Sequence, residues 1–151
     1  LGMQVIGYDP LIAADEITRR GAEPVSLENL YARADFITVH IPLTPESKNM
    51  LSGQAFAQMK RGVRLIDAAR GGVLDETALL GALESGQVAA AALDVFTSEP
   101  PGLSALVAHP NVIATPHIGA QTEEAQTRAS ADIASEVLNG LEGKPLRWRV
   151  A

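Results

Sequence analysis

The 151-residue sequence contains no cysteine. This absence excludes disulfide bonds and metal sites built from thiolates, because both require cysteine sulfur. A protein without disulfides suits a reducing compartment, so we expect a cytoplasmic protein. We also expect no metal ion in its functional site.

Basic residues are scarce as well. The chain has 12 Lys and Arg residues against 18 Asp and Glu residues, which gives a formal net charge of −6. Proteins that bind nucleic acids use clustered Lys and Arg side chains to neutralise phosphates. We therefore expect a small-molecule partner and no nucleic acid.

Long apolar runs are missing too. The longest, Val88 to Leu93, has six residues, whereas a membrane-spanning helix needs roughly 20. With 46% hydrophobic and 20% charged residues, the composition is that of a globular domain. We expect one domain and no membrane span, because the length suits a single core.

Short β-branched runs alternate with amphipathic stretches along the chain, a pattern that predicts an α/β fold with a mostly parallel sheet. The five predicted strands are Met3 to Tyr8, Phe36 to His40, Arg64 to Asp67, Val88 to Val95 and Val112 to Ala114. The five predicted helices are Ile12 to Arg20, Leu27 to Ala32, Gly53 to Met59, Asp75 to Glu84 and Thr122 to Leu141. Asp75 and Thr122 are the predicted N-caps of the last two helices.

The first candidate site residue is Asp9, which follows an apolar run. Ligands bind at the carboxyl ends of parallel strands, where this carboxylate would accept both ribose hydroxyls of NAD and repel the 2′-phosphate of NADP. The alternative is a turn-forming Asp before Pro10. In dinucleotide folds a G-x-G-x-x-G loop precedes such an Asp by about 20 residues, and the sequence contains no such loop.

Arg70 is a second candidate, placed between a strand end and the pair Gly71-Gly72. The glycines let the backbone turn sharply, so that Arg70 can project over the edge of the sheet. Its planar guanidinium suits a substrate carboxylate, and a solvated loop arginine is the alternative. Glu76 is interpreted as an acidic residue in the first turn of the next helix.

Two acidic residues lie at or after the end of the strand predicted at 88–95. Asp94 ends that strand, where a side chain can hold the nicotinamide end of a cofactor. Glu99 stands before Pro100 and Pro101, which hold its segment extended. Helix or turn formation does not explain a carboxylate at this position, although a solvated Glu99 is the alternative.

His117 is the best candidate base among the three histidines, because it follows a short strand and Pro116 and precedes a turn of small residues. His109 is interpreted as a surface loop residue, and His40 either lines a cofactor cleft or is simply buried. A lone histidine is more often structural than catalytic, so the hypothesis rests on its companions.

Arg70, Glu99 and His117 follow successive strands and are therefore predicted to meet at one edge of the sheet. Oxidation of a 2-hydroxy acid needs a base for the hydroxyl proton while a nicotinamide accepts the hydride. His117 would take the proton, Glu99 would fix its tautomer, and Arg70 would hold the substrate carboxylate.

The sequence resembles the D-2-hydroxyacid dehydrogenase family over roughly residues 1 to 143. The matching motifs, in the family's order and spacing, are VIGYDP (5–10), DFITVHIP (35–42), ARGG (69–72) with Asp75-Glu76, AALDVF (91–96) with Glu99-Pro100-Pro101, and PHIGA (116–120). The resemblance implies a Rossmann-like, doubly wound parallel sheet, with residues 1–143 as part of an NAD-binding domain and 144–151 as a tail leading out of it.

The resemblance also implies roles for individual residues. It makes Arg70, Glu99 and His117 the catalytic residues. The positions expected to contact NAD are Asp9, His40, Ile41, Pro42, Ala68, Arg70, Asp94, His117, Gly119 and Ala120. The stretches PHIGAQT and HIPLTPESKNML are most similar to the phosphoglycerate dehydrogenase branch, which implies oxidation of D-3-phosphoglycerate to 3-phosphohydroxypyruvate in serine biosynthesis. A homodimer formed through this domain is also implied.

Relative to the family, the sequence lacks the glycine-rich loop, the first strand and helix of the cofactor domain, and the substrate domain. We expect a piece of a longer chain, whose sheet lacks the strand between those ending at Asp9 and Asp67 and exposes unpaired apolar edges. We expect these 151 residues alone to bind NAD weakly or not at all, to show no turnover, and to aggregate unless another segment or chain completes them.

Two other functions stay open from the sequence. One is a non-enzymatic, NAD-sensing module like the corepressors that share this fold and also keep the Arg, Glu and His. The other is an inert domain that serves only as a dimer scaffold.

Overall fold

The computed structural model describes residues 2–148, and the chain divides into two compact units, Leu1–Pro116 and His117–Ala151. Strands and helices alternate through the first unit, and the second contains one long helix. The predicted α/β class is confirmed. Within the described residues, no helix is long and apolar enough to cross a membrane.

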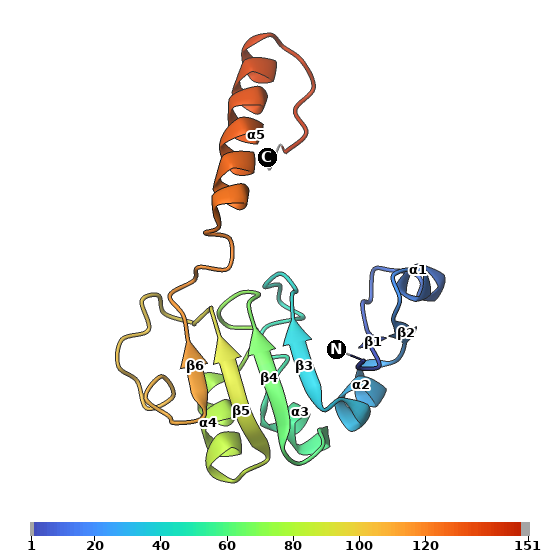
Figure 1. Ribbon diagram of the computed structural model, residues 1–151, viewed down its shortest axis with the longest axis vertical. Helices are drawn as coiled ribbons and strands as arrows, with labels where there is room; N and C mark the ends of the chain where they lie inside the picture. Colours follow the sequence, from blue (N-terminus) through green and yellow to red (C-terminus); the bar gives the residue numbers. More distant parts are fainter. Residues whose placement is uncertain (1, 149–151) are drawn as a thin grey trace. The chain divides into compact units, whose positions relative to one another are not determined.

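The first unit contains two parallel sheets (Figure 1). One consists of β1 (Ile6–Gly7) and β2 (Glu23–Pro24). The other has the order β3 (Phe36–Val39), β4 (Val63–Asp67), β5 (Val88–Leu93) and β6 (Val112–Ala114), and every neighbouring pair is parallel. All five predicted strands are present, with β1 shorter than expected.

The helices also follow the prediction. They are α1 (Ala14–Arg19), α2 (Leu27–Arg33), α3 (Gly53–Gln58), α4 (Glu76–Glu84) and, in the second unit, α5 (Glu123–Leu141). Asp75 Oδ1 accepts the Ala78 N–H at 3.0 Å, and Thr122 Oγ1 accepts the Ala125 N–H at 3.2 Å. Both predicted N-caps are confirmed, because each side chain satisfies a first-turn amide that has no partner inside its helix.

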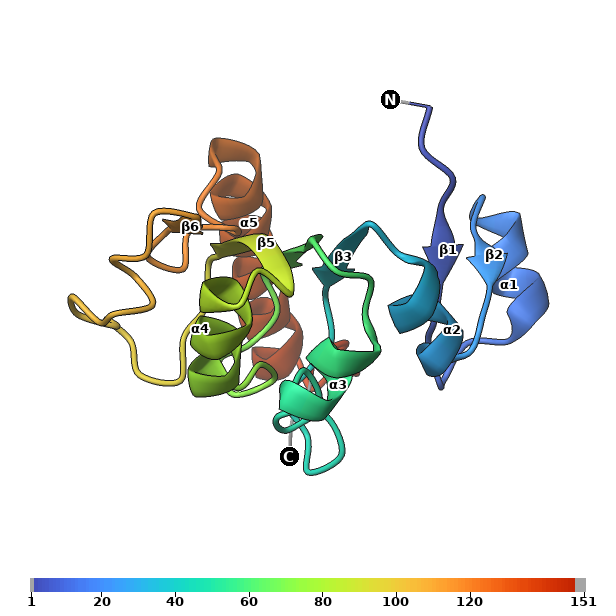
Figure 2. The same ribbon diagram turned by 90° about the horizontal axis from the view of Figure 1, so that it is seen from below.

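One face of the larger sheet is covered by helices. Figure 2 shows α2, α3 and α4 on the same side of β3, β4 and β5. Alternate residues of the strands face this side, so Ile37 and Leu65 are buried whereas Phe36 is 52% exposed. Leu79 of α4 and Val73 are fully buried against the sheet. The core therefore lies between one sheet face and these helices, and it holds the strands that carry the candidate site.

The strand β2 was missed by the sequence prediction. Its two residues, Glu23 and Pro24, show neither an apolar run nor an alternating pattern. The strand exists because residues 23–25 pair with β1 and the residue before it. The Glu23 N–H donates to Val5 O at 2.9 Å, and the Val25 N–H donates to Gly7 O at 3.0 Å. Pairing of this kind is set by tertiary contacts and leaves no local signal.

The predicted location of the sheet's gap was wrong. We expected it beside the strand ending at Asp67, but β4 is paired on both sides, by β3 and by β5. The edge strand beside the gap is β3, and a pocket of about 650 Å³ separates residues 35–38 from residues 3–6, which lead into β1. The gap thus lies between β1 and β3.

The second unit consists of residues 117–122, the helix α5 and the segment that follows it. Ile133, Val137 and Leu141 on this helix are 65%, 56% and 81% exposed. The Glu136 carboxylate accepts the N–H groups of Arg147 and Trp148 at 2.9 and 3.2 Å, which folds the tail back onto the helix. The tail predicted at 144–151 is described only as far as residue 148.

Candidate active site

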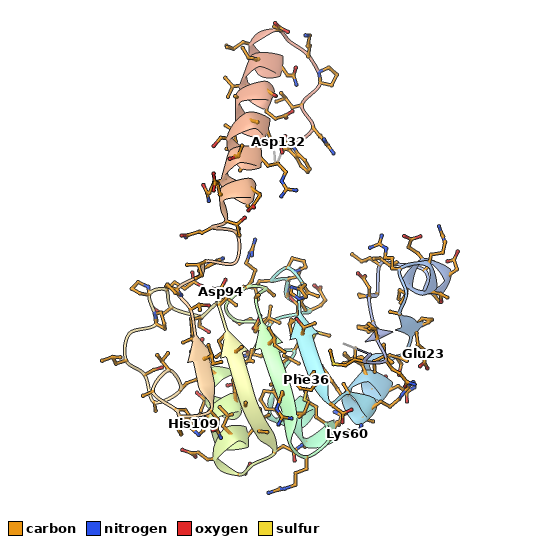
Figure 3. All side chains as sticks on the ribbon, viewed as in Figure 1. Glu23, Phe36, Lys60, Asp94, His109 and Asp132 are labelled. Carbon is orange, nitrogen blue, oxygen red and sulfur yellow. The ribbon has the colours of Figure 1, made fainter. Side chains whose placement is uncertain are left out.

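The register of the larger sheet brings the ends of its four strands into one row. The last residues pair across the sheet as Val39 with Asp67, Asp67 with Leu93, and Leu93 with Ala114. The residues that follow, His40, Ala68, Asp94 and Thr115, therefore leave the sheet side by side at its carboxyl edge. Figure 3 shows Asp94 at this edge and His109 at the opposite one, as expected for a loop histidine outside the site.

Asp94 is held in place from two sides. Its N–H donates to Asp67 O at 2.9 Å, which continues the pairing of β4 with β5 by one residue. Its Oδ1 accepts the hydroxyl of Thr115 at 2.6 Å. The carboxylate is thus fixed at the edge where parallel sheets bind nucleotides, in agreement with its predicted position. Thr115 was missed, although it stands two residues before His117 in the sequence.

Asp67 is a buried carboxyl group that the sequence prediction treated only as the end of a strand. It is 2% exposed, and its Oδ1 accepts the Ala69 N–H at 3.0 Å. Burial raises the pKa of Asp67, while this hydrogen bond and the nearby His40 act to lower it. The available signal was a charged residue closing an apolar strand.

The loop after β3 carries His40, Ile41 and Pro42. His40 is exposed, and its Nε2 lies 2.7 Å from Thr38 Oγ1, so the structure favours a residue at the rim of the site over a buried one. The loop is held by Ser47, which is 8% exposed and whose hydroxyl donates to Pro42 O at 2.7 Å. The predicted positions 40–42 therefore sit on an anchored loop.

Arg70 lies in the loop between β4 and α4, as predicted, with an exposed side chain. Its Nη1 donates to the carbonyl of Ala69 at 2.7 Å. The following glycines differ in their roles. Gly72 has a φ of 90°, which confirms the predicted sharp turn. Gly71 instead makes a close approach, because a Cβ there would lie 1.9 Å from the carbonyl oxygen of Phe96.

Glu99 lies in the loop that follows β5, with an exposed side chain whose Oε1 accepts the Phe96 N–H at 3.0 Å. In the same loop, the Thr97 N–H donates to Oε1 of Glu76 at 2.6 Å. Together with the contact between Gly71 and Phe96, this brings the loops of Arg70 and Glu99 against each other. The structure thus joins two of the three predicted catalytic residues through their loops.

Asp9 follows β1 at the carboxyl end of the smaller sheet. Its Oδ1 accepts the Leu11 N–H at 2.8 Å, which confirms the turn that was considered for it. The same residue lines a pocket of about 450 Å³ together with Ile12 and Val25. A turn residue at a strand end still presents its carboxylate to a ligand, so the two interpretations are compatible.

His117, Gly119 and Ala120 belong to the second unit. His117 has a φ of 55°, a left-handed backbone that costs a residue with a Cβ on the order of 1 kcal/mol and is concentrated at functional sites. The Gln121 N–H donates to Ile118 O at 2.8 Å, which closes the predicted turn. His117 thus lies in the second unit, whereas Arg70 and Glu99 lie in the first.

The carboxyl edge of the first unit can bind an anion and hold a nucleotide. It presents the Arg70 guanidinium for a carboxylate, and Asp94 with Thr115 for the polar groups of a cofactor. The anchored loop at 40–42 and the strand-end position of Asp94 suit the nicotinamide half of NAD. Among residues 2–148, no group of three or more His, Asp or Glu residues is placed to hold a metal ion.

Residues 1–119 match the family described as D-isomer specific 2-hydroxyacid dehydrogenase, NAD binding domain. The D-3-phosphoglycerate dehydrogenase of Pongo abelii is 51% identical over 146 residues, and that of Bacillus subtilis is 50% identical over 145 residues. A solved structure of D-lactate dehydrogenase from Aquifex aeolicus, complexed with NAD and lactic acid, is similar with a TM-score of 0.84 and 31% identity.

These matches differ in how much of each protein they cover. The similarity covers 97% of this chain but 27% of the Pongo protein, and 96% of this chain but 28% of the Bacillus protein. For the Aquifex structure it covers 94% of this chain and 47% of that chain. The chain therefore spans about a quarter of the length of the curated relatives it matches.

Proposed function

The chain belongs to the D-isomer specific 2-hydroxyacid dehydrogenases, as part of their NAD-binding domain, and from this we propose that the whole protein oxidises a D-2-hydroxy acid to the 2-oxo acid with NAD. The proposed substrate is D-3-phosphoglycerate, which would become 3-phosphohydroxypyruvate in serine biosynthesis. The choice of substrate rests on sequence identities of 51% and 50%, over nearly the whole chain, to relatives named D-3-phosphoglycerate dehydrogenase.

In the proposed reaction, separate residues bind the substrate, move the proton and hold the cofactor. Arg70 binds the substrate carboxylate through its planar guanidinium and fixes the reacting carbon. His117 removes the hydroxyl proton, and Glu99 orients the imidazole and stabilises its protonated form. Asp94 and Asp9 bind the nicotinamide and adenosine ends of the cofactor. NAD, when bound, supplies the acceptor for the hydride.

The contact between the loops that carry Arg70 and Glu99 supports these roles. Arg70 and Glu99 come from separate loops whose backbones touch through Gly71 and Phe96, and the side chain of Glu99 is bound to its own loop through the Phe96 N–H. A site whose groups are held in this way needs little reorganisation when the substrate binds. The left-handed backbone of His117 is a further sign of a built site.

A substrate panel on the full-length parent protein tests the proposal. NADH formation is measured with D-3-phosphoglycerate, D-lactate, D-glycerate and glycolate. We expect the highest kcat/KM for D-3-phosphoglycerate, and a loss of at least about 100-fold for Arg70→Met as the carboxylate loses its partner. A parent that oxidises none of these acids, or an Arg70→Met variant with unchanged kcat/KM, would contradict the proposal.

We further propose a cytoplasmic homodimer assembled through this domain. The exposed apolar side chains of α5, including Val137, Leu138 and Leu141, are candidates for burial in such an interface. Sedimentation of the full-length parent tests this: a dimer that becomes a monomer on Leu141→Glu supports the proposal, and a monomeric wild type contradicts it.

A further inference from the structure

Two loops of the first unit are joined by direct contacts. The Arg70 loop is residues 68–75, between β4 and α4, and the Glu99 loop is residues 94–101, after β5. Three contacts connect them or their ends: the Asp94 N–H to Asp67 O, the approach of Gly71 to Phe96, and the Thr97 N–H to Glu76. The first simply continues the sheet. The other two need specific residues.

The contact at Gly71 admits no side chain. A Cβ there would lie 1.9 Å from the Phe96 carbonyl oxygen and 2.9 Å from the Thr97 nitrogen. The two backbones therefore touch at this position, and Arg70 is the immediate neighbour of the contact. Phe96 cannot move away, because its side chain is 4% exposed and packs in the core.

Glu76 reaches across to the other loop instead of serving its own helix. It is the first residue of α4, where an acidic side chain is usually explained by the helix dipole alone. The helix already has its cap, since Asp75 accepts the Ala78 N–H. The Glu76 Oε1 lies 2.6 Å from the Thr97 nitrogen, a short charge-assisted hydrogen bond across 21 residues of sequence.

The two neighbouring amides of the Glu99 loop are thus bound by two different carboxylates. Glu99 accepts the Phe96 N–H and Glu76 accepts the Thr97 N–H. The first bond fixes the side chain of Glu99 against its own loop. The second fixes that loop against the helix that follows Arg70. The orientation of Glu99 relative to Arg70 consequently depends on the carboxylate of Glu76.

We propose that Glu76 is a positioning residue of the active site, which holds the Glu99 loop in register with the Arg70 loop. The inference rests on the proposed dehydrogenase function. Without the Glu76 carboxylate, residues 97–99 gain freedom and the Glu99 side chain, which is bound to this loop, is no longer held in a fixed position. A displacement of about 1 Å at a catalytic group lowers turnover by up to about 100-fold. Binding of NAD depends on other residues and stays unchanged.

The test compares Glu76→Ala, Glu76→Gln and a control, Glu84→Ala at the far end of the same helix, in the full-length parent protein. We expect kcat of Glu76→Ala to fall about 10- to 100-fold with KM for NAD within about twofold. Glu76→Gln keeps an acceptor oxygen and restores most of kcat, whereas Glu84→Ala leaves it unchanged. The acidic limb of the pH profile of kcat/KM moves to lower pH in Glu76→Ala, because Glu99 no longer favours protonated His117.

Backbone amide exchange of residues 96 and 97, followed by mass spectrometry of the same variants, gives a readout that is independent of activity. Faster exchange there in Glu76→Ala alone supports the contact. The inference is overturned if amide exchange at residues 96 and 97 is unchanged in Glu76→Ala, or if kcat of Glu76→Ala stays within about twofold of wild type. It is also overturned if kcat falls equally in Glu76→Ala and Glu76→Gln and the pH profile does not change. A wild type that oxidises no 2-hydroxy acid would contradict the proposed function itself.

Discussion

Two glycines near the site differ in what a side chain would meet. At Gly71 a Cβ would collide with the Phe96 carbonyl, whereas at Gly81 in α4 it would meet nothing within 4 Å. We expect Gly71→Ala to lower the free energy of unfolding by about 3 kcal/mol, because backbone must shift. Gly81→Ala should raise it by about 1 kcal/mol through helix propensity. Urea denaturation measures both, and equal effects would contradict the close approach.

Asp67 makes stability depend on pH. Burial raises its pKa in the folded state above the ordinary value of 3.8, so the folded protein holds this proton more tightly than the unfolded chain does. The free energy of unfolding therefore falls as pH rises from about 3.8 through the folded-state pKa of Asp67. At neutral pH the folded protein bears the whole cost of burying the charged carboxylate.

The isosteric change Asp67→Asn tests this sign. An Asn keeps an oxygen for the Ala69 N–H and carries no charge, so the variant should be more stable than wild type at neutral pH and lose this advantage in acid. Thermal unfolding across the pH range is the measurement, with the exposed Asp132→Asn as control. An Asn variant that is less stable at neutral pH would show that the charge is favourable.

At the scale of single residues, the sequence predicted chemical types and strand-end positions but not the contacts that join them. Arg70, Asp94 and Glu99 could be named because each lies at or after the end of an apolar strand, and because helix or turn formation did not explain Glu99. The role of Glu76 could not, since an acidic residue in a first helical turn is ordinary and its partner lies 21 residues away. Contacts that form only in the folded chain leave no trace in local pattern.

Among the elements, α5 is a long helix that begins at a side-chain cap. It has no buried residue in the second unit, so packing contributes little there and the Thr122 side chain is its clearest support. We expect Thr122→Ala to destabilise the helix by about 1 kcal/mol. Thr127→Ala, in the exposed helix interior, should instead stabilise it by about 0.5 kcal/mol.

Amide exchange of residues 123–126 measures this difference. Faster exchange in Thr122→Ala and slower exchange in Thr127→Ala are expected. If Thr122→Ala left the exchange of these amides unchanged, the helix would be held by contacts other than its cap.

Elements with strong periodicity were predicted well, and their ends less well. The helices α2 and α4 and the strand β6 match their predicted ranges closely, because apolar spacing and caps mark them. β1 is shorter than predicted and β2 has no sequence signal. Both lie in the small sheet, where pairing depends on a neighbour and not on local preference.

For the whole chain, we expect weak or no binding of NAD by the 151 residues alone. The sequence contains no G-x-G-x-x-G loop, so the pyrophosphate lacks the backbone amides and helix N-terminus that usually bind it. Isothermal titration of this chain with NAD measures the affinity, and the full-length parent is the matched control. Micromolar binding by the chain alone would contradict the expectation.

The sheet topology limits what a single sequence can show about the whole molecule. The resemblance predicted an interrupted sheet, and the structure has one, but it places the gap beside β3 and not beside β4. Strand order is a long-range property, and nothing in the run from Phe36 to Val39 identifies it as an edge. Exposed Phe36 and Ile113 on the uncovered face agree with the predicted tendency to aggregate, which remains a prediction.

The proposed reaction requires that His117 joins Arg70 and Glu99 in one site. The measurement that decides this is a crystal structure of the full-length parent with NAD and D-3-phosphoglycerate. We predict a Glu99 oxygen within hydrogen-bond distance of one His117 nitrogen, about 2.6 to 3.2 Å, and both Arg70 terminal nitrogens on the substrate carboxylate. An imidazole beyond contact of Glu99, or a guanidinium directed away from the substrate, would contradict the proposed site.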